Sequence, residues 1–235
     1  MNKDLNVLIL AGGKSSRMKQ KKSKIFLKVG SKTFLEHSIY FAEQLKPKSI
    51  FIVINKKYSY LEKIHKQCKF VYQDKALGTA DAVKSFLKTL PTENKLLLTY
   101  VDTPLMSFVS AKNIIKKLNK NDLVIYTFQS KKNKNYGLVK KDKNNKIMKI
   151  IEYNNATKQE KKIHLCNSGM MGIAKNNFKN IFNIKKNSNS GEYLITDLVN
   201  ISYKKKLRIA NINENKKRVL GVNTIKDYQE LKKSI

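Results

Sequence analysis

Short apolar runs rich in β-branched residues alternate with segments of helical apolar spacing along most of this sequence. The runs predict strands over residues 5–10, 49–54, 70–73, 95–101, 122–128, 136–139, 147–152, 169–173 and 207–212. The helical spacing predicts helices over 33–45, 58–67, 80–90, 111–118 and 193–203, near Phe178, and from about Thr224. Strands separated by helices usually pair in parallel through right-handed crossovers. The alternation therefore favours one mixed, mostly parallel sheet.

Two local patterns refine this expectation. Thr33 and Glu36 have the spacing of a capping box, which would start the helix over 33–45. The segment 140–146, “KKDKNNK”, is typical of a hairpin tip or loop between two strands.

The chain carries a formal net charge of +32 over 235 residues, almost all of it from lysine. Such charge can indicate nucleic-acid or membrane binding. Here the lysines are scattered, asparagine is abundant beside them, and no RNA-recognition signature, zinc finger or helix-turn-helix is present. We expect no specific nucleic-acid partner and no membrane partner, and some attraction for phosphorylated substrates.

Neither export nor a membrane anchor is expected. No window holds 18 consecutive apolar residues, and the N-terminal run lacks an A-x-A-like cleavage site. Cys68 and Cys166 lack metal-site spacing, so they are interpreted as free thiols in a reducing compartment. A cytoplasmic location follows as the expectation.

The segment 8–18, “LILAGGKSSRM”, joins the end of the first strand to a glycine pair and a basic loop. Gly12 and Gly13 allow the backbone to turn and to approach a ligand closely, and successive N–H groups in such a loop can bind an anion. Arg17 is one of only three arginines and offers a bidentate fork for phosphate. The spacing matches neither a P-loop nor a dinucleotide fingerprint.

Other polar residues follow strands of the predicted sheet. Gly78 and Thr79 lie between a strand and a helix, and Asp102 ends the run “LLLTYV”. In open α/β sheets, ligands bind at the carboxyl ends of the strands. Asp102 there could bind a hard cation, although it would equally suit a turn before Pro104.

The segment “LAGGKSSRM”, followed six residues later by Lys24, resembles the signature loop of the nucleotide-sugar pyrophosphorylase superfamily. Further segments occur in the order found in bacterial N-acetylglucosamine-1-phosphate uridylyltransferases, and they span nearly the whole chain. These segments are “QDKALGTADAV”, “LLLTYVDTPLM”, “NYGLV”, “IIEYNNATKQEKKIHLCNSGMMGI”, “GEYLITD” and “VLGVNT”. The stretch from Glu152 through Asn167 is the most specific, because most other members of the superfamily differ there.

The resemblance implies a Rossmann-like three-layer α/β/α nucleotidyltransferase fold over residues 1–235. It also implies a reaction in which a sugar 1-phosphate attacks the α-phosphorus of a nucleoside triphosphate and pyrophosphate leaves. UTP and N-acetylglucosamine 1-phosphate are the implied substrates, and Mg²⁺, held by Asp102 and Asn223, is the implied cofactor. Such an in-line displacement depends on positioning and charge stabilisation.

The resemblance also assigns roles to other residues. Arg17 and Lys24 match the catalytic basic residues that contact the phosphates, although Lys24 is one of five lysines between Lys19 and Lys28. The nucleotide-binding matches are Leu10, Ala11, Gly12, Gly13, Lys14, Gln73, Gly78 and Thr79. The sugar-binding matches are Gly137, Glu152, Asn167 and Thr196, with Tyr193 nearby.

Several positions depart from the family pattern. The loop usually reads A-G-K-G-T-R-M, and the version here, “AGGKSSRM”, is closer to molybdenum-cofactor guanylyltransferases. Ser23 stands in place of proline, Val101 in place of glycine, and Asp81 in place of a small residue or histidine. Val101 is expected to crowd the base or the sugar. A cytidylyl- or guanylyltransferase for another phosphorylated acceptor, including a molybdopterin-type one, is thus an alternative. A non-catalytic nucleotide- or nucleic-acid-binding module is the alternative from another class.

The sequence contains no hexapeptide repeat of the kind that forms the β-helix acetyltransferase part of the family's common form. We therefore expect no acetyl-CoA chemistry and no trimerisation through such a domain, and the oligomeric state stays open.

Overall fold

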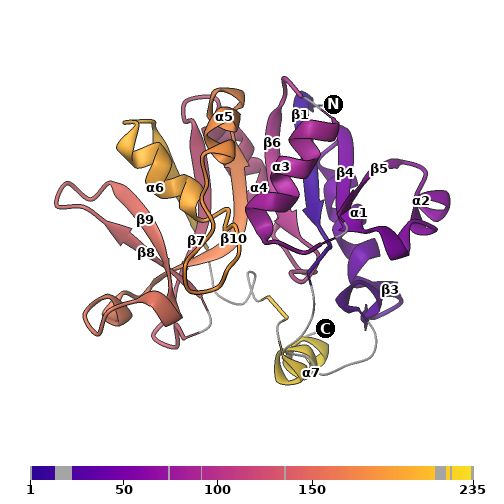
Figure 1. Ribbon diagram of the computed structural model, residues 1–235. Helices are drawn as coiled ribbons and strands as arrows, with labels where there is room; N and C mark the ends of the chain where they lie inside the picture. Colours follow the sequence, from indigo (N-terminus) through magenta and orange to yellow (C-terminus); the bar gives the residue numbers. More distant parts are fainter. Residues whose placement is uncertain are drawn as a thin grey trace.

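The computed structural model describes residues 2–13, 23–73, 75–90, 92–134, 136–214, 221–222 and 224–233. A nine-stranded sheet runs through it, with the path β11-β7-β10-β6-β1-β4-β5 (Figure 1). The strands on this path are β1 (Asn2–Leu10), β4 (Pro47–Asn55), β5 (Cys68–Gln73), β6 (Lys95–Tyr100), β7 (Leu123–Gln129), β10 (Leu165–Ile173) and β11 (Ile209–Glu214). Neighbours on this path pair in parallel except β10, which is antiparallel to both β6 and β7. The predicted mixed, mostly parallel sheet is confirmed.

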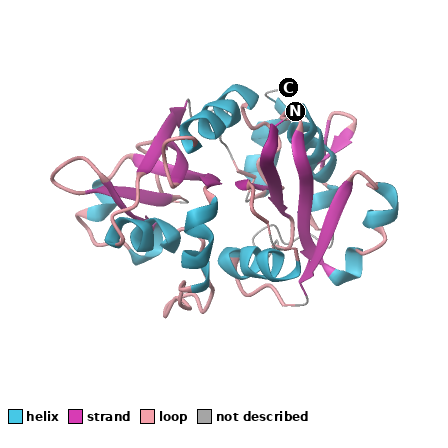
Figure 2. Cartoon of the chain, turned by 90° about the horizontal axis from the view of Figure 1, so that it is seen from above, coloured by secondary structure: helices cyan, strands magenta, loops and turns pink. Residues whose placement is uncertain are grey.

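Helices cover both faces of the sheet (Figures 1 and 2). The described helices are α1 (Phe34–Gln44), α2 (Leu61–Ile64), α3 (Thr79–Thr89), α4 (Phe108–Leu118), α5 (Phe178–Phe182), α6 (Asp197–Lys204) and α7 (Ile225–Lys233). Buried side chains of α1 and α4 belong to one core cluster, and those of α3, α5 and α6 belong to a second. Because the central strands bury side chains on both faces, the sheet needs a helical layer on each side. The three-layer α/β/α arrangement is thus confirmed.

Strand β1, in the interior of the sheet, shows this double burial clearly. Six consecutive residues of β1, from Leu5 to Leu10, are buried. Leu8 contributes to one core cluster, and Ile9 contributes to the other. The backbone of β1 pairs with β4 on one side and β6 on the other, so its carboxyl end lies between two other strand ends.

The predicted capping box is present at the start of α1. The Thr33 hydroxyl accepts from the Glu36 backbone N–H at 3.2 Å, and the Glu36 carboxylate accepts from the Thr33 N–H at 2.6 Å. Both partners lie within one turn, so local sequence was sufficient to find this helix start.

A β-hairpin extends from the main sheet beside β10. Strands β8 (Gly137–Lys141) and β9 (Ile147–Glu152) pair antiparallel, and β8 also touches β10 at Leu138 and Cys166. The predicted hairpin tip is confirmed, with Asn145 in the left-handed region at φ 60° and Asp142 accepting two backbone N–H bonds. Helix α6 packs against β9 (Figure 1). A separate two-stranded ribbon, β2 (Lys28–Val29) with β3 (Lys32–Thr33), precedes α1.

Three predicted elements differ most in extent. The helix expected over 58–67 is only the four-residue α2, because His65 leaves the helical region and Cys68 already pairs with Ile50 in the sheet. The helix expected from 193 begins at Asp197, because the backbone of Tyr193 is bonded to Leu77 and Ala80 instead. The strand expected from 169 begins at Leu165, where pairing with β7 starts. In each case tertiary pairing overrides local spacing.

No helix among the described residues is long and apolar enough to span a bilayer.

Candidate nucleotide and sugar site

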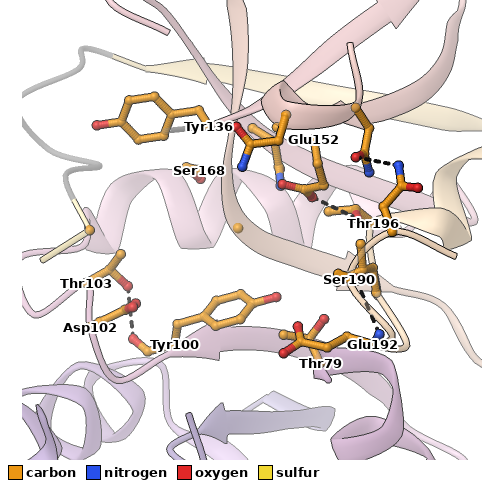
Figure 3. Close-up of a pocket in the computed structure, with 18 residues that line it drawn as sticks. Thr79, Tyr100, Asp102, Thr103, Tyr136, Glu152, Ser168, Ser190, Glu192 and Thr196 are labelled. Carbon is orange, nitrogen blue, oxygen red and sulfur yellow. Dashed lines mark hydrogen bonds between the residues drawn. The ribbon is translucent and has the colours of Figure 1, made fainter. Parts of the chain in front are cut away.

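A cavity of about 590 Å³ opens between the carboxyl end of β6 and the β8–β9 hairpin (Figure 3). Its walls come from segments far apart in sequence, including the turn after β6, the start of β8, the end of β9, the middle of β10 and the loop before α6. These segments meet at one place because β10 lies antiparallel beside β6. The position agrees with the general preference of ligands for strand carboxyl ends.

The four residues expected on the sugar side line this one cavity: Gly137, Glu152, Asn167 and Thr196. The Thr196 hydroxyl donates to Glu152 Oε1 at 3.3 Å. A Cβ added at Gly137 would lie 3.6 Å from Glu152 Oε1 and 3.8 Å from Asn167 Cβ. It would also lie 2.6 Å from Ile150 Cγ2, which is too close, so only glycine leaves this wall unperturbed.

Asn167 carries the most informative atom of the site. Its side-chain oxygen is buried and has no hydrogen-bond partner, and among the described residues only Asn6 Oδ1 shares that state. Asn6 lies in the middle of β1, whereas Asn167 lines the cavity. An unpaired buried acceptor is costly, so Asn167 Oδ1 marks a place where a ligand N–H or O–H would be stabilised.

The segment before α3, which is expected to contact the base, is hydrogen-bonded to the loop before α6, which borders the sugar side. Ala80 N donates to Tyr193 O at 2.8 Å, Tyr193 N donates to Leu77 O at 2.8 Å, and Ile195 N donates to Thr79 Oγ1 at 2.9 Å. Gly78 lies between these bonds with φ 117°, and a Cβ there would overlap the Tyr193 backbone. Glycine is therefore required at position 78 both for its conformation and for its size.

The first glycine loop meets the end of β5. Leu10 and Ala11 are buried, and Ala11 N donates to Val53 O at 2.8 Å, which ties the loop to β4. A Cβ added at Gly12 would lie 3.3 Å from Gln73 Oε1, whereas one at Gly13 would meet nothing within 4 Å. The structure thus brings the expected base-contacting glutamine against the expected phosphate loop.

Lys24 and Asp102 lie beside each other at the edge of the cavity. Lys24 Nζ is 3.2 Å from Asp102 Oδ2, and the two side chains are 13% and 26% exposed. The Asp102 carbonyl accepts from Val222 N at 2.7 Å, so the segment just before Asn223 is fastened to the aspartate. Asn223 itself lies outside the described residues, as do Lys14 and Arg17.

The donor set suits a magnesium ion bound partly by substrate. Among the described residues, no group of three or more His, Cys, Asp or Glu side chains could hold a metal. Mg²⁺ commonly uses one or two carboxylates and takes its other ligands from phosphates and water. The partly exposed Asp102 carboxylate can supply one such ligand.

Tyr100 is a cavity residue that sequence reasoning did not identify. Its ring lies against Gly169, where an added Cβ would be 3.0 Å away. Burial raises the pKa of the Tyr100 hydroxyl, and the negative charges of Asp102 and Glu152 raise it further. The only sequence signal is its place two residues before Asp102 at the end of a buried strand.

Two loops close one end of the cavity through a contact that the sequence did not indicate. Asn189 Nδ2 donates to Asn155 Oδ1 at 2.8 Å, which joins the turn after β9 to the loop before α6. Ser190 and Glu192 continue that rim (Figure 3). The two asparagines are 34 residues apart, so no local pattern indicates their contact.

The expected effect of Val101 is wrong for the described cavity. Its side chain is 6% exposed and belongs to the core cluster that also contains residues of α1 and α4. Successive side chains at a strand end point to opposite sides, so Val101 faces the core while Tyr100 and Asp102 line the cavity.

The fold and this polar cavity define a nucleotidyltransferase-like α/β protein, and comparisons with known proteins agree. Residues 7–165 match the sequence profile of the MobA-like NTP transferase domain, and the chain belongs to this family. It is similar to the bifunctional protein GlmU of Buchnera aphidicola subsp. Baizongia pistaciae, with 32% identity over 95% of this chain and 51% of that protein. It is also 32% identical to GlmU of Wolbachia pipientis wMel, over 100% of this chain and 56% of that protein.

The chain spans about half the length of these curated relatives. Among solved structures, a UDP-glucose pyrophosphorylase complexed with UDP-glucose superposes with a TM-score of 0.76 at 17% identity. That superposition covers 100% of this chain and 98% of the other. The likeness confirms the nucleotidyltransferase fold expected from the sequence.

Proposed function

We propose that this chain transfers a nucleotidyl group from a nucleoside triphosphate to a sugar 1-phosphate, with UTP and N-acetylglucosamine 1-phosphate as its substrates. The observation that carries this proposal is the unpaired, buried Asn167 Oδ1 beside Glu152 in a polar cavity. An acetamido sugar offers an amide N–H as well as hydroxyls, and these are the donors that two neighbouring acceptors require. Membership in the family supports the transfer reaction, and the motif resemblance supports the particular substrates.

In the proposed reaction, an oxygen of the sugar phosphate attacks the α-phosphorus of the triphosphate, and pyrophosphate leaves in line. The cavity would hold the sugar through Glu152 and Asn167 with its phosphate directed toward Asp102. Lys24, 3.2 Å from Asp102, would bind a phosphate oxygen and stabilise the developing charge. The glycine loop would supply backbone N–H donors, and Arg17 a bidentate contact.

Asp102 and Asn223 would hold Mg²⁺, which supplies charge neutralisation on the phosphate oxygens when bound. The protein's own contribution is positioning, because the two substrates must lie with reacting atoms near contact distance before displacement. A cytoplasmic location and the absence of a specific nucleic-acid partner remain predictions that accompany this function.

The test is pyrophosphate release over a grid of the four nucleoside triphosphates, each with several phosphorylated acceptors and Mg²⁺. The acceptors are N-acetylglucosamine 1-phosphate, glucose 1-phosphate and molybdopterin. We expect the highest kcat/KM for UTP with the acetamido sugar. A preference for GTP with molybdopterin, or for CTP with any acceptor, would replace the substrate assignment. If the folded protein released no pyrophosphate with any combination of nucleotide and acceptor, the result would support a non-catalytic binding module.

A further inference from the structure

The end of β5 and the first turn of α3 form a second built arrangement beside the glycine loop. Gln73 ends β5 and is 8% exposed. Its backbone carbonyl accepts from Asn55 Nδ2 at 3.3 Å, at the point where Asn55 and Gln73 are paired in register. Its side-chain amide reaches the third residue of α3, where Gln73 Nε2 donates to Asp81 Oδ2.

This contact determines which way the Gln73 amide faces. A carboxylate can only accept hydrogen bonds, so the NH₂ end of the amide must point to Asp81. The oxygen end then points to the glycine loop, and Gln73 Oε1 lies 3.3 Å from the Cβ position of Gly12. Among the described residues no side chain or backbone group donates to that oxygen.

Lys84 is a cation on α3 that interacts electrostatically with Asp81, but its hydrogen bond goes elsewhere. Lys84, one turn further along α3, donates to Ile184 O at 2.8 Å and lies 4.5 Å from the centre of the Tyr193 ring. The place of Asp81 in the first turn of α3 also favours its negative charge, because the helix N-terminus carries a partial positive charge. The carboxylate is thus a stable acceptor for Gln73.

We propose that Asp81 is a positioning residue that makes the enzyme select nucleobases with a keto-imino edge, by holding Gln73 with its acceptor toward the base. Uracil has a ring N–H beside a carbonyl oxygen. Gln73 Oε1 can accept from that N–H, and the second hydrogen on Nε2 can donate to the carbonyl. Cytosine has a ring nitrogen lone pair beside an amino group, which is the reverse pattern. It would require a flipped amide whose oxygen faced the Asp81 carboxylate.

The inference rests on the proposed function, in which Gln73 meets the base of the triphosphate. It adds the residue that sets the choice of base, and it concerns a position where this chain departs from its family pattern. Guanine has the same keto-imino edge as uracil. Asp81 would therefore favour uracil and guanine over cytosine and adenine, but it would not discriminate between uracil and guanine.

The experiment measures equilibrium binding of UTP and CTP, each with Mg²⁺ and without any sugar phosphate, by calorimetry. Wild type should prefer UTP. In Asp81→Asn the introduced amide can donate or accept, so Gln73 can flip without repulsion. The ratio of the Kd for CTP to the Kd for UTP should then fall roughly tenfold, mainly because CTP binds more tightly. This size corresponds to one charge-assisted hydrogen bond.

Asp4→Asn is the matched control, because it removes one carboxylate near the start of β1, where the Asp4 side chain is 65% exposed. It should leave the UTP/CTP ratio unchanged. Should Asp81→Asn fail to fold, Asp81→Ala supplies the same test, since loss of the carboxylate also removes the acceptor that holds the Gln73 amide in one orientation. An unchanged ratio in folded Asp81→Asn, or a wild-type preference for CTP, would overturn the proposal.

The two failures are distinguishable. A normal UTP reaction with an unaltered ratio in the variant would refute the role of Asp81 and leave the proposed function standing. Selective UTP binding that depends on Asp81, without any pyrophosphate release, would refute the transfer reaction and retain the base selection.

Discussion

The Lys24 ammonium faces the Asp102 carboxylate at 3.2 Å, so the side chain expected to bind phosphate and the one expected to bind metal neutralise each other. In the proposed reaction each side chain would also bind a second group: Lys24 would bind a phosphate oxygen, and Asp102 would bind Mg²⁺. Both side chains are more than two thirds buried, which strengthens their interaction relative to a fully exposed pair.

Replacing Asp102 should separate catalysis from folding. Asp102→Ala is expected to lower kcat by about 10²-fold or more, because the charge-stabilising metal loses its carboxylate ligand. Stability should change by only about 1 kcal/mol, since the ion pair retains some solvent contact. Steady-state pyrophosphate release and thermal unfolding measure the two effects. Wild-type turnover in the variant would contradict the metal assignment.

Replacing Asn167 should affect recognition of the sugar. Asn167→Ala removes the unpaired acceptor, so KM for N-acetylglucosamine 1-phosphate is expected to rise about tenfold. KM for UTP should stay within about twofold, because Asn167 lines the cavity expected to hold the sugar, whereas Gly12 and Gly13 do not line it. Asn144→Ala, in the exposed hairpin turn, is the matched control. Equal rises for both substrates would argue against a sugar-specific role.

Gly78 should tolerate no side chain. At φ 117°, Gly78→Ala would be strained, and its Cβ would lie 2.7 Å from Tyr193 N. We expect a loss of about 3 kcal/mol in the free energy of unfolding. Gly30→Ala is a matched comparison, because Gly30 also has a positive φ, 59°, but has nothing within 4 Å of the added Cβ. Its cost should be about 1 kcal/mol, from backbone strain alone. Similar losses in both variants, measured by urea unfolding, would refute the clash.

Asp122 should make stability depend on pH in the acid range. Burial acts to raise the pKa of Asp122, but hydrogen bonds from Arg208 and Asn176 outweigh it, and the pKa is lowered. Stability from a lowered carboxyl pKa is complete above the ordinary aspartate range, near pH 4, and is lost as the pH falls through the folded-state pKa.

Asp122→Asn is accordingly expected to cost about 1–3 kcal/mol at pH 7, because Arg208 N, at 2.7 Å from Asp122 Oδ2, loses its charged acceptor. The difference from wild type should shrink when unfolding is measured at pH 3. A difference that is constant between pH 7 and pH 3 would show that packing, and not the charge, is responsible.

What the sequence by itself determined is the part that depends on near neighbours. The alternation of strands and helices, the Thr33–Glu36 cap and the turn at 140–146 all involve residues within a few positions, and the structure confirms them. The segments that resemble a known family also indicated which residues to expect at the site. Many of them follow strands, and the carboxyl ends of parallel strands meet at one edge of a sheet.

Only the tertiary structure decided how those residues face one another. The insertion of β10 antiparallel to β6 places Gly169 against the ring of Tyr100, and the register of β5 places Gln73 within reach of Asp81 and Gly12. Such contacts depend on strand order and register, which are chosen by the burial of both faces of the sheet together. No local window of the sequence contains that information, because the partners lie up to dozens of residues apart.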